Sequence, residues 1–507
     1  MYRKLFKNCG TISAGLIVSR ASGLVKIMIV AAIFGTNDSM DAFLLAIALP
    51  IAAMTVFGDG IYVATVKLMS RHKSENSEFS QGWREVSSLF NFSVLAMAVL
   101  AALYWIFSPQ IVRLVAPSFS EEKFVQTWTL ARCVAPIIVL GAAQSVLRGV
   151  LHANDRFALP SIKILLSNIP TLIAVITLTG KFGIASFAVG TVIGEFLVCL
   201  AWYIVASRVG ARYSFSWAGG SRGIRESVRL GMPVIVGVGM LQIITITDRA
   251  FAAALPGGSI SALGYAMLLL AVPLSHVRTI VDAGFPSIAA IMHKRTAGHD
   301  QELRRAVRSW VKLLVVVTVP AAMMLLLWRE PVVRLLLERG KFGAASVSAT
   351  ASALLFYAIA LVPTVGRYFL TRLSQAFGDS LTPLPSNIAF AVSNIALNFL
   401  LVPVLGHPAI ALSLALSTTL GVCILYMQLR RRIPVLANCG IETETLKVLT
   451  AGTMMAVAFL VSRMLLDSVI GAGCIAVAVY PLALVAVRIV SIRRVLQLRT
   501  LLQAPSG

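Results

Sequence analysis

The sequence has few charged side chains for its length. Only 13% of its 507 residues are charged, whereas 58% are hydrophobic, and the mean hydropathy is +0.86. A soluble protein cannot keep such a composition dispersed in water, so this deficit excludes a soluble globular protein and indicates a membrane protein. The sequence also has no long polar stretch in which a sizeable soluble domain could fold.

The motifs of several enzyme classes are missing as well. The sequence has no GxxxxGK[ST] loop for nucleotide phosphates, no HExxH zinc motif and no GxSxG nucleophile turn. Its six cysteines show no paired spacing and mostly fall in apolar runs, where cysteine acts as a small hydrophobe: Cys9, Cys133, Cys199, Cys423, Cys439 and Cys474. We therefore predict no catalytic residue, no metal site, no cofactor and no disulfide framework, and we do not expect an enzyme.

What the sequence does contain is a series of apolar runs, each near the roughly 20 residues that a spanning helix needs. They predict an all-α polytopic membrane protein with about fourteen transmembrane helices and little chain left over. The predicted spans are 8–34, 38–68, 84–108, 125–152, 158–179, 184–207, 226–254, 260–291, 308–328, 345–374, 383–403, 408–429, 446–466 and 470–490.

The charges that are present are unbalanced, since 44 Lys and Arg residues against 21 Asp and Glu residues give a net charge of +23. Such an excess could indicate nucleic-acid binding. However, basic residues cluster in alternate loops, and the intervening loops 35–38, 255–259 and 403–408 have no Lys or Arg. By the positive-inside rule, this alternation places both termini in the cytoplasm. We therefore attribute the charge to membrane topology and predict no nucleic-acid partner.

Two stretches more than 200 residues apart carry the same pattern. Ala42–Pro50 reads AFLLAIALP and is followed nine residues later by Asp59, while Tyr265–Pro273 reads YAMLLLAVP and is followed nine residues later by Asp282. A proline and then a lone carboxylate are both costly within an apolar helix in lipid. Their recurrence indicates an internal duplication, which is typical of transporters built from two like halves.

The repeat continues in later spans. Ile184–Thr191 (IASFAVGT) resembles Ile410–Ser417 (IALSLALS), and Ser167–Ile169 recurs as Ser393–Ile395, again six spans later. Because six is even, the two halves have the same orientation. We predict two parallel six-helix lobes around a central cavity, formed by residues 1–207 and 226–429. Residues 208–225 form a cytoplasmic linker, and residues 430–507 hold two added helices and a cytoplasmic tail.

One predicted external loop is charged, Glu330–Phe342, which reads EPVVRLLLERGKF. Glu330, Arg334 and Glu338 are spaced at i, i+4 and i+8, so opposite charges can pair along one helical face. We interpret the segment as a short amphipathic helix at the outer interface, with an ordinary connecting loop as the alternative.

Charged residues within the predicted spans are the candidate site residues, because a charge at membrane depth usually faces a cavity or a partner. Arg20 and Lys26 lie in the first span, six residues and thus about 120° apart on the helix. Together with an acid they could bind an anionic head group and release it when a proton or ion arrives. A structural pair between Arg20 and an acid such as Asp41 is the alternative.

Three further charges could form coupling or cavity pairs. Arg278 and Asp282 are four residues apart in the eighth span and could pair within the helix, and Asp59 lies below Pro50 in the second. For the acids of both spans, a structural role is the alternative to ion coupling.

Several segments resemble the MurJ (MviN) family, the peptidoglycan lipid II flippases of the MOP superfamily, and the resemblance covers nearly the whole chain. The segment EPVVRLLLERGKF is similar to that family's loop between spans nine and ten and is the most specific match. The other matching segments are Ser19–Arg20 through Gly23 and Lys26, Ile33–Gly35, Asp41–Phe43, Gly149–Pro160 and Leu255–Ser259.

The resemblance implies a fourteen-helix fold with a cationic cavity and a groove beside spans 13 and 14 for a polyprenyl tail. It implies that the protein moves a lipid-linked disaccharide-pentapeptide from the inner to the outer leaflet of the bacterial inner membrane. By position, Arg20 and Lys26 match the family's first two cavity arginines and Asp41 matches the acid of span two, which makes these three the predicted substrate-binding residues. The implied partners are a polyprenyl-diphosphate-linked glycan and membrane lipid, with proteins of cell-envelope synthesis as candidates.

The sequence departs from the family pattern where further cavity charges are usual. Span two has Ala48 and Met54 in place of basic residues, and Met267–Leu268 replaces an Asp-Arg pair in span eight. Lysine at position 26 keeps the charge but lacks the planar fork that binds a diphosphate bidentately. These departures predict weaker or different head-group binding.

We therefore predict a flippase for an undecaprenyl-diphosphate-linked saccharide, with lipid II as the leading substrate. Another lipid-linked glycan is the nearest alternative. A small-molecule antiporter of the related MATE type and a non-transporting membrane scaffold are alternatives of other classes.

Overall fold

The structure is a computed structural model, and it describes residues 2–74, 79–217, 222–293, 299–377, 382–433, 436, 440–466, 468–487 and 489. The described residues form helices and no strands, which confirms the predicted all-α class. Residues 218–221 of the predicted linker, Cys439, and the predicted tail beyond residue 489 lie outside the described residues, as does the side chain of Cys9.

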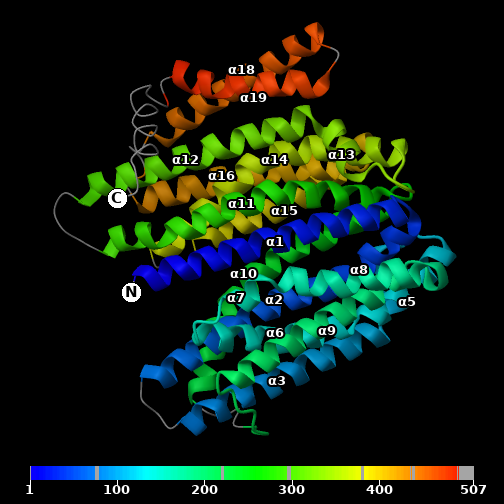
Figure 1. The fold of residues 1–507 in the computed structure, drawn as a ribbon, viewed down its shortest axis with the longest axis vertical. Coiled ribbons are helices and arrows are strands. Elements are labelled where there is room, and N and C mark those ends of the chain that lie inside the picture. The colour runs from blue at the N-terminus through cyan, green and yellow to red at the C-terminus, as the bar shows by residue number, and fades with distance from the viewer. Residues whose placement is uncertain are drawn as a thin grey trace. The chain divides into compact units, whose positions relative to one another are not determined.

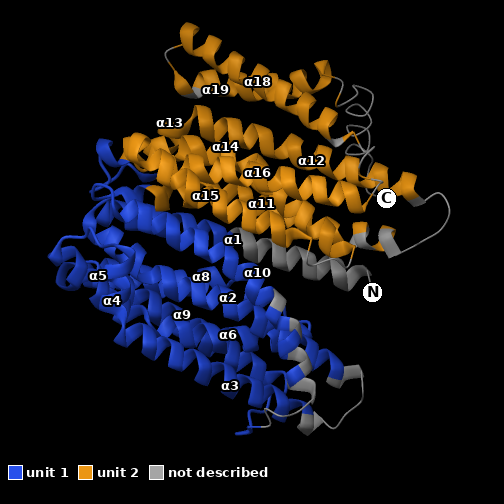
Figure 2. Ribbon diagram, turned by 180° about the vertical axis from the view of Figure 1, so that it is seen from behind, with its two compact units in different colours: residues 1–262, 337–346 blue, residues 263–336, 347–507 orange. Residues whose placement is uncertain are grey.

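The chain divides into two compact units, which Figure 2 colours blue and orange. Unit 1 comprises residues 1–262 and 337–346. Its helices, labelled in Figure 1 except for α4, which Figure 2 labels, are α1 (Tyr2–Phe34), α2 (Asp38–Ser74), α3 (Phe79–Ile106), α4 (Ser108–Val115), α5 (Glu121–Val134), α6 (Pro136–Ala153), α7 (Ala158–Ser161), α8 (Lys163–Phe182), α9 (Ala185–Arg208), α10 (Arg222–Ala253) and the first turn of α11 (Ser259–His293).

Unit 2 comprises residues 263–336 and 347–507. It contains the rest of α11 together with α12 (His299–Leu327), most of α13 (Arg329–Leu337), most of α14 (Ala344–Ala376), α15 (Pro383–Leu405), α16 (Pro408–Arg432), α18 (Ile441–Leu465) and α19 (Val469–Ala486).

The long helices follow the predicted spans. Among the residues searched, twelve helices are long and apolar enough to cross a membrane, and Gly471–Ala486 within α19 adds a shorter apolar helix. The 33-residue α1 covers the first predicted span. Predicted span four is divided into α5 and α6, because Pro136 has no backbone N–H to continue the helical hydrogen-bond ladder. The chain is a multi-pass membrane protein.

The lobe boundaries predicted from the repeat, 1–207 and 226–429, are not the boundaries of the compact units. Helix α10 begins the predicted second half, yet it packs against α2 and belongs to unit 1. Because a repeat and a packing unit are different properties, the division into lobes stays a prediction.

Pro50 lies inside α2 and removes the donor that would have bonded the carbonyl of Ala46, one turn earlier. The buried hydroxyl of Tyr104 on α3 donates to that carbonyl at 2.6 Å. In lipid an unpaired backbone carbonyl costs several kcal/mol, so this contact allows the proline within a membrane helix. It also holds α2 and α3 together, beside a shared core of α2, α3, α6 and α9 that includes Leu68, Trp83, Val146, Leu151 and Trp202.

Helices α8 and α9 pack closely through Gly190 and Gly194, which form a GxxxG pattern on α9. A Cβ atom at Gly194 would lie 2.4 Å from the carbonyl oxygen of Ser167, and one at Gly190 would lie 2.7 Å from the Cβ of Ala174. Only glycine allows the two backbones to come this near. This approach brings the residue after the pattern, Glu195, against α8.

In unit 2 the corresponding spans, α15 and α16, also pack against each other, as the repeat predicts. The two added helices, α18 and α19, pack together and against α12 through buried Val319, Val448, Ala451, Met455 and Tyr480. The predicted external amphipathic segment forms α13, and Arg334 Nη2 lies 2.7 Å from Glu330 Oε1, one turn apart. Glu338 lies one residue beyond the helix, which ends at Leu337.

Candidate functional site

Asp41 on α2 is buried, with 1% of its surface exposed, and its carboxylate is surrounded by donors. The backbone N–H groups of Gly258 and Ser261 donate to its two oxygens, each at 2.7 Å. The ammonium of Lys123 on α5 lies 3.2 Å from Oδ2 and also pairs with Asp38 at 2.6 Å. Asp41 therefore caps the first turn of α11 and anchors it to α2. The prediction that it contacts substrate is not tested by these contacts.

The turn before α11 has to be built from glycine. Gly258 has a φ of +91°, which side-chain-bearing residues rarely adopt. A Cβ atom at Gly257 would lie 2.3 Å from a carboxylate oxygen of Asp38. The sequence LPGGS thus lets the backbone approach both acids of α2 closely enough for capping.

Lys26 lies on the face of α1 that packs against α7 and α8. Ser19, Ser22 and Lys26 are spaced at i, i+3 and i+7 and so share this face. The Ser19 hydroxyl donates to the carbonyl of Ser161 at 3.1 Å, and Asn168 Nδ2 donates to the Ser22 hydroxyl at 3.1 Å. Lys26 interacts electrostatically with Glu195 on α9. The structure therefore brings Lys26 toward an acid inside unit 1.

Glu195 is the centre of a polar cluster that the sequence analysis missed. Its carboxylate accepts from Gln144 Nε2 on α6 at 2.9 Å and from the Ser167 hydroxyl on α8 at 2.9 Å, and it lies 3.2 Å from Lys163 Nζ. A lone acid in a 24-residue apolar helix, directly after a GxxxG pattern, was the signal that could have revealed it. With Lys26, the cluster sets two cations against one carboxylate.

This cluster belongs to the first half of the repeat alone. At the repeat spacing of 226 residues, Gly421 and Ala389 take the places of Glu195 and Lys163 in the second half. Since both halves build the same helix pair, the charges are not needed for that architecture.

Arg20 is half-buried on α1. It is the residue after Ser19, so it lies about 100° around the helix from the face that contacts α7 and α8. The structure thus does not bring Arg20 and Lys26 onto one face.

Asp59 forms an ion pair with Arg148. Its Oδ1 lies 2.9 Å from Arg148 Nη2 on α6, and the Arg148 guanidinium stacks 4.2 Å from the centroid of the Tyr62 ring. The Tyr62 hydroxyl in turn bonds His152 Nδ1 at 2.9 Å. These contacts place Asp59 in a network that joins α2 to α6.

The pair expected between Arg278 and Asp282 does not form. Asp282 Oδ1 instead lies 3.2 Å from Arg372 Nη2 and accepts from the Tyr368 hydroxyl at 2.6 Å, both on α14. The Arg278 guanidinium lies 5.2 Å from the centroid of the Tyr368 ring. The tyrosine and the second arginine hold the carboxylate, and spacing within α11 could not reveal either of them.

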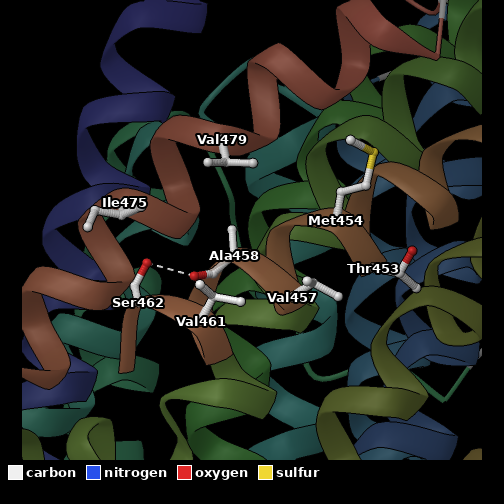
Figure 3. A pocket seen from close by; sticks show the side chains of 8 residues that line it. All are labelled: Thr453, Met454, Val457, Ala458, Val461, Ser462, Ile475 and Val479. Carbon is white, nitrogen blue, oxygen red and sulfur yellow. Dashed lines mark hydrogen bonds between the residues drawn. The ribbon is translucent and has the colours of Figure 1, made fainter. Parts of the chain in front are cut away.

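Helices α18 and α19 form an apolar groove with a volume of about 500 Å³. Figure 3 shows its lining, with Val457 and Val461 from α18 and Ile475 and Val479 from α19. The hydroxyl of Ser462 is bonded to the carbonyl of Ala458 at 2.7 Å, so it does not make the groove polar.

Comparison with known proteins decides the family. The family model described as lipid II flippase MurJ matches residues 30–477, which is most of the chain. The chain belongs to the MurJ family. A curated relative from Rickettsia prowazekii (strain Madrid E), named "Probable lipid II flippase MurJ", is 24% identical over 454 residues, which cover 87% of each chain.

Two solved structures have the same fold as this chain. A structure described as lipid II flippase MurJ in an inward closed conformation matches with a TM-score of 0.79 and 22% identity, covering 93% of this chain and 97% of that one. An inward-facing multidrug resistance MATE family transporter of the MOP superfamily matches with a TM-score of 0.69 and 15% identity, covering 83% and 95%. At these identities the likeness concerns the fold alone.

Metal ligands are not grouped in the part of the chain that the structure describes. There, no set of three or more His, Cys, Asp or Glu side chains could hold a metal ion. Four cysteines with described side chains, Cys133, Cys199, Cys423 and Cys474, are free thiols.

Proposed function

We propose that this chain is a flippase that moves an undecaprenyl-diphosphate-linked saccharide from the inner to the outer leaflet of the bacterial cytoplasmic membrane. Lipid II is the leading substrate. The protein acts as a transporter and not as an enzyme. The observation that carries the proposal is the match to the lipid II flippase family model over residues 30–477.

The groove on α18 and α19 supports the lipid part of the proposal. A polyprenyl chain has no hydrogen-bonding groups, and the groove offers apolar side chains and hydroxyls that are already bonded within α18. Its volume of about 500 Å³ accommodates a segment of the tail, while the rest of the tail stays in the bilayer.

In this proposal Arg20 and Lys26, about 120° apart around α1, border one wide cavity and both bind the diphosphate. A guanidinium is the stronger ligand because its planar fork donates two parallel hydrogen bonds to phosphate oxygens. Glu195 competes with the diphosphate for Lys26, since it already interacts with that side chain. Arg20 therefore supplies the larger part of the head-group affinity.

Alternating access of two lobes, residues 1–207 and 226–429, moves the head group across the membrane. Both termini lie in the cytoplasm, as the distribution of Lys and Arg among the loops indicates.

The test is translocation by the full-length protein reconstituted into vesicles that contain fluorescent lipid II. We expect protein-dependent movement across the bilayer, measured with a quencher that cannot enter the vesicles. Arg20→Ala should slow it roughly tenfold, because one hydrogen bond to a charged phosphate contributes about 1.5–3 kcal/mol. Arg334→Ala is the matched control, since the exposed Arg334 side chain pairs with Glu330 within α13.

The same vesicles separate the alternatives. Failure to move lipid II or any other undecaprenyl-diphosphate-linked saccharide would refute the flippase. Movement of another such glycan but not of lipid II would change the substrate and keep the mechanism. Ion-coupled exchange of a cationic drug that survives Arg20→Ala would instead indicate a MATE-like antiporter.

A further inference from the structure

A basic and aromatic cluster joins α11 and α14 within unit 2. The guanidinium carbons of Arg278 and Arg372 each lie 5.2 Å from the centroid of the Tyr368 ring. Arg372 Nη2 also donates to the Tyr368 hydroxyl at 3.0 Å and lies 3.2 Å from Asp282 Oδ1. The cluster holds two arginines and one carboxylate, so its net charge is positive.

Arg278 has N–H donors that no described residue accepts from. Among the residues that the structure describes, its guanidinium stacks on Tyr368 but forms no hydrogen bond and no ion pair within 4 Å. Its side chain is exposed, and the side chain of Arg372 is 38% exposed. A ligand can therefore reach both guanidinium groups, and Tyr368 holds their planes in place.

The position of the cluster along α11 matches the depth of lipid head groups. Arg278 is nineteen residues after Ser259, the first residue of α11, which corresponds to about 28 Å along the helix. The hydrocarbon core of a bilayer is about 30 Å thick. With the outer end of α11 at Ser259, as the proposed topology has it, Arg278 lies at the level of the phosphates of the cytoplasmic leaflet.

We propose that Arg278, Arg372 and Tyr368 form a binding subsite for the phosphate head of an anionic lipid in the cytoplasmic leaflet. This subsite rests on the proposed function, because the lipid-linked diphosphate enters from that leaflet. Two guanidinium groups donate to phosphate oxygens in the geometry that favours arginine over lysine. The subsite captures the substrate before its head group enters the protein.

Asp282 sets the strength of this subsite. In the structure it accepts from Tyr368 and pairs with Arg372, so it keeps that arginine in position when no lipid is bound. It also repels an approaching phosphate and competes with it for Arg372. Removing its charge should therefore strengthen lipid binding, whereas a purely structural acid would weaken it when removed.

The test measures binding of undecaprenyl diphosphate to the full-length protein in phosphatidylcholine nanodiscs. Arg278→Gln and Arg372→Gln should each weaken binding roughly tenfold, the loss expected for hydrogen bonds to a charged group. Asp282→Asn should strengthen it roughly threefold or more, because the neutral amide still accepts from Tyr368 but no longer repels phosphate. Arg334→Gln, the same charge change on α13, should leave it unchanged.

A second arm uses phosphatidylglycerol, which carries a single phosphate, as the probe. A weaker effect of the arginine variants on this lipid supports capture of the diphosphate. Equal losses for both lipids support a general phosphate-lipid site and overturn the link to the substrate. Binding of both lipids within twofold of wild type, in variants that keep the wild-type elution volume, overturns the subsite.

The translocation assay separates the two proposals. A wild-type protein that binds undecaprenyl diphosphate through Arg278 but moves no lipid-linked saccharide retains the subsite and refutes the flippase. Normal translocation by the wild-type protein, together with undecaprenyl diphosphate binding that does not change in Arg278→Gln, retains the flippase and refutes the subsite.

Discussion

Replacing Asp41 by asparagine should release the first turn of α11 from α2. The carboxylate accepts two backbone N–H groups, from Gly258 and Ser261, each at 2.7 Å. An asparagine side chain has one oxygen, so at least one of these N–H groups loses its acceptor. The substituted amide also directs its own N–H toward a donor or toward the Lys123 ammonium at this buried position.

The size of the effect follows from these contacts. A hydrogen bond to a charged group contributes about 1.5–3 kcal/mol, and the buried pair with Lys123 is lost as well. Because Lys123 keeps its contact with Asp38 at 2.6 Å, we expect the free energy of local opening to fall by about 3 kcal/mol in total. This corresponds to roughly a hundredfold increase in the population of the open form.

Amide hydrogen exchange, followed by mass spectrometry on the purified full-length protein, measures this opening directly. Peptides that contain residues 258–262 should exchange roughly a hundredfold faster in Asp41→Asn. The control is Asp38→Asn, which pairs with the same lysine but is 65% exposed. An exposed ion pair contributes at most about 1 kcal/mol, so that variant should change exchange by less than about fivefold.

Equal exchange rates of residues 258–262 in Asp41→Asn and Asp38→Asn would contradict the capping role of Asp41, because burial and the two backbone contacts distinguish Asp41 from Asp38. Exchange in Asp41→Asn within threefold of wild type would show that the capping contacts do not hold the turn.

Three further predictions concern packing and the groove. Gly194→Ala should destabilise the protein by about 1–3 kcal/mol and lower its Tm by several degrees, because the new Cβ would meet a carbonyl of α8 at 2.4 Å. A Cβ atom at Gly180 would have no neighbouring atom within 4 Å, so Gly180→Ala should leave the Tm unchanged. Tyr104→Phe should lower stability by about 1–2 kcal/mol in detergent melts, because the Ala46 carbonyl loses its donor. Ala458→Trp should fill the groove and weaken undecaprenyl diphosphate binding by about fivefold, because the tail loses roughly 40 Å² of apolar contact. Binding of a two-isoprene diphosphate, whose tail is short, should stay unchanged.

The apolar runs predicted the helices well because each run is limited by a property that can be read locally. A membrane helix needs an apolar stretch of set length, and its end is marked by polar residues or proline. The same locality explains α13, where Glu330 and Arg334 pair across one turn. Its placement at the outer interface is still a prediction.

The partners of the charged residues were much harder to predict. Asp41 and Ser261 are 220 residues apart in sequence, and the partners of Asp282 are on α14. Helical periodicity states which residues share a face, but not which helix covers that face. For the same reason Arg278 and Asp282, neighbours by spacing, are not an ion pair.

Glu195 shows what was available in the sequence and overlooked. An acid within an apolar helix is costly in lipid, and this one follows Gly194 in a pattern that brings helices close together. The pattern could have predicted a partner on a neighbouring helix. It could not have named Gln144, Ser167 and Lys163, which come from two helices.

By itself, the amino-acid sequence determined that the protein is a multi-pass helical membrane protein, approximately where its helices lie, and which family it resembles. These properties depend on the cost of placing polar groups in lipid and on patterns within one helix. The tertiary structure alone decided which cations meet which carboxylates, and that Asp41 caps a helix. Those contacts depend on how separate helices approach one another, which the small residues and prolines allow but no local pattern specifies.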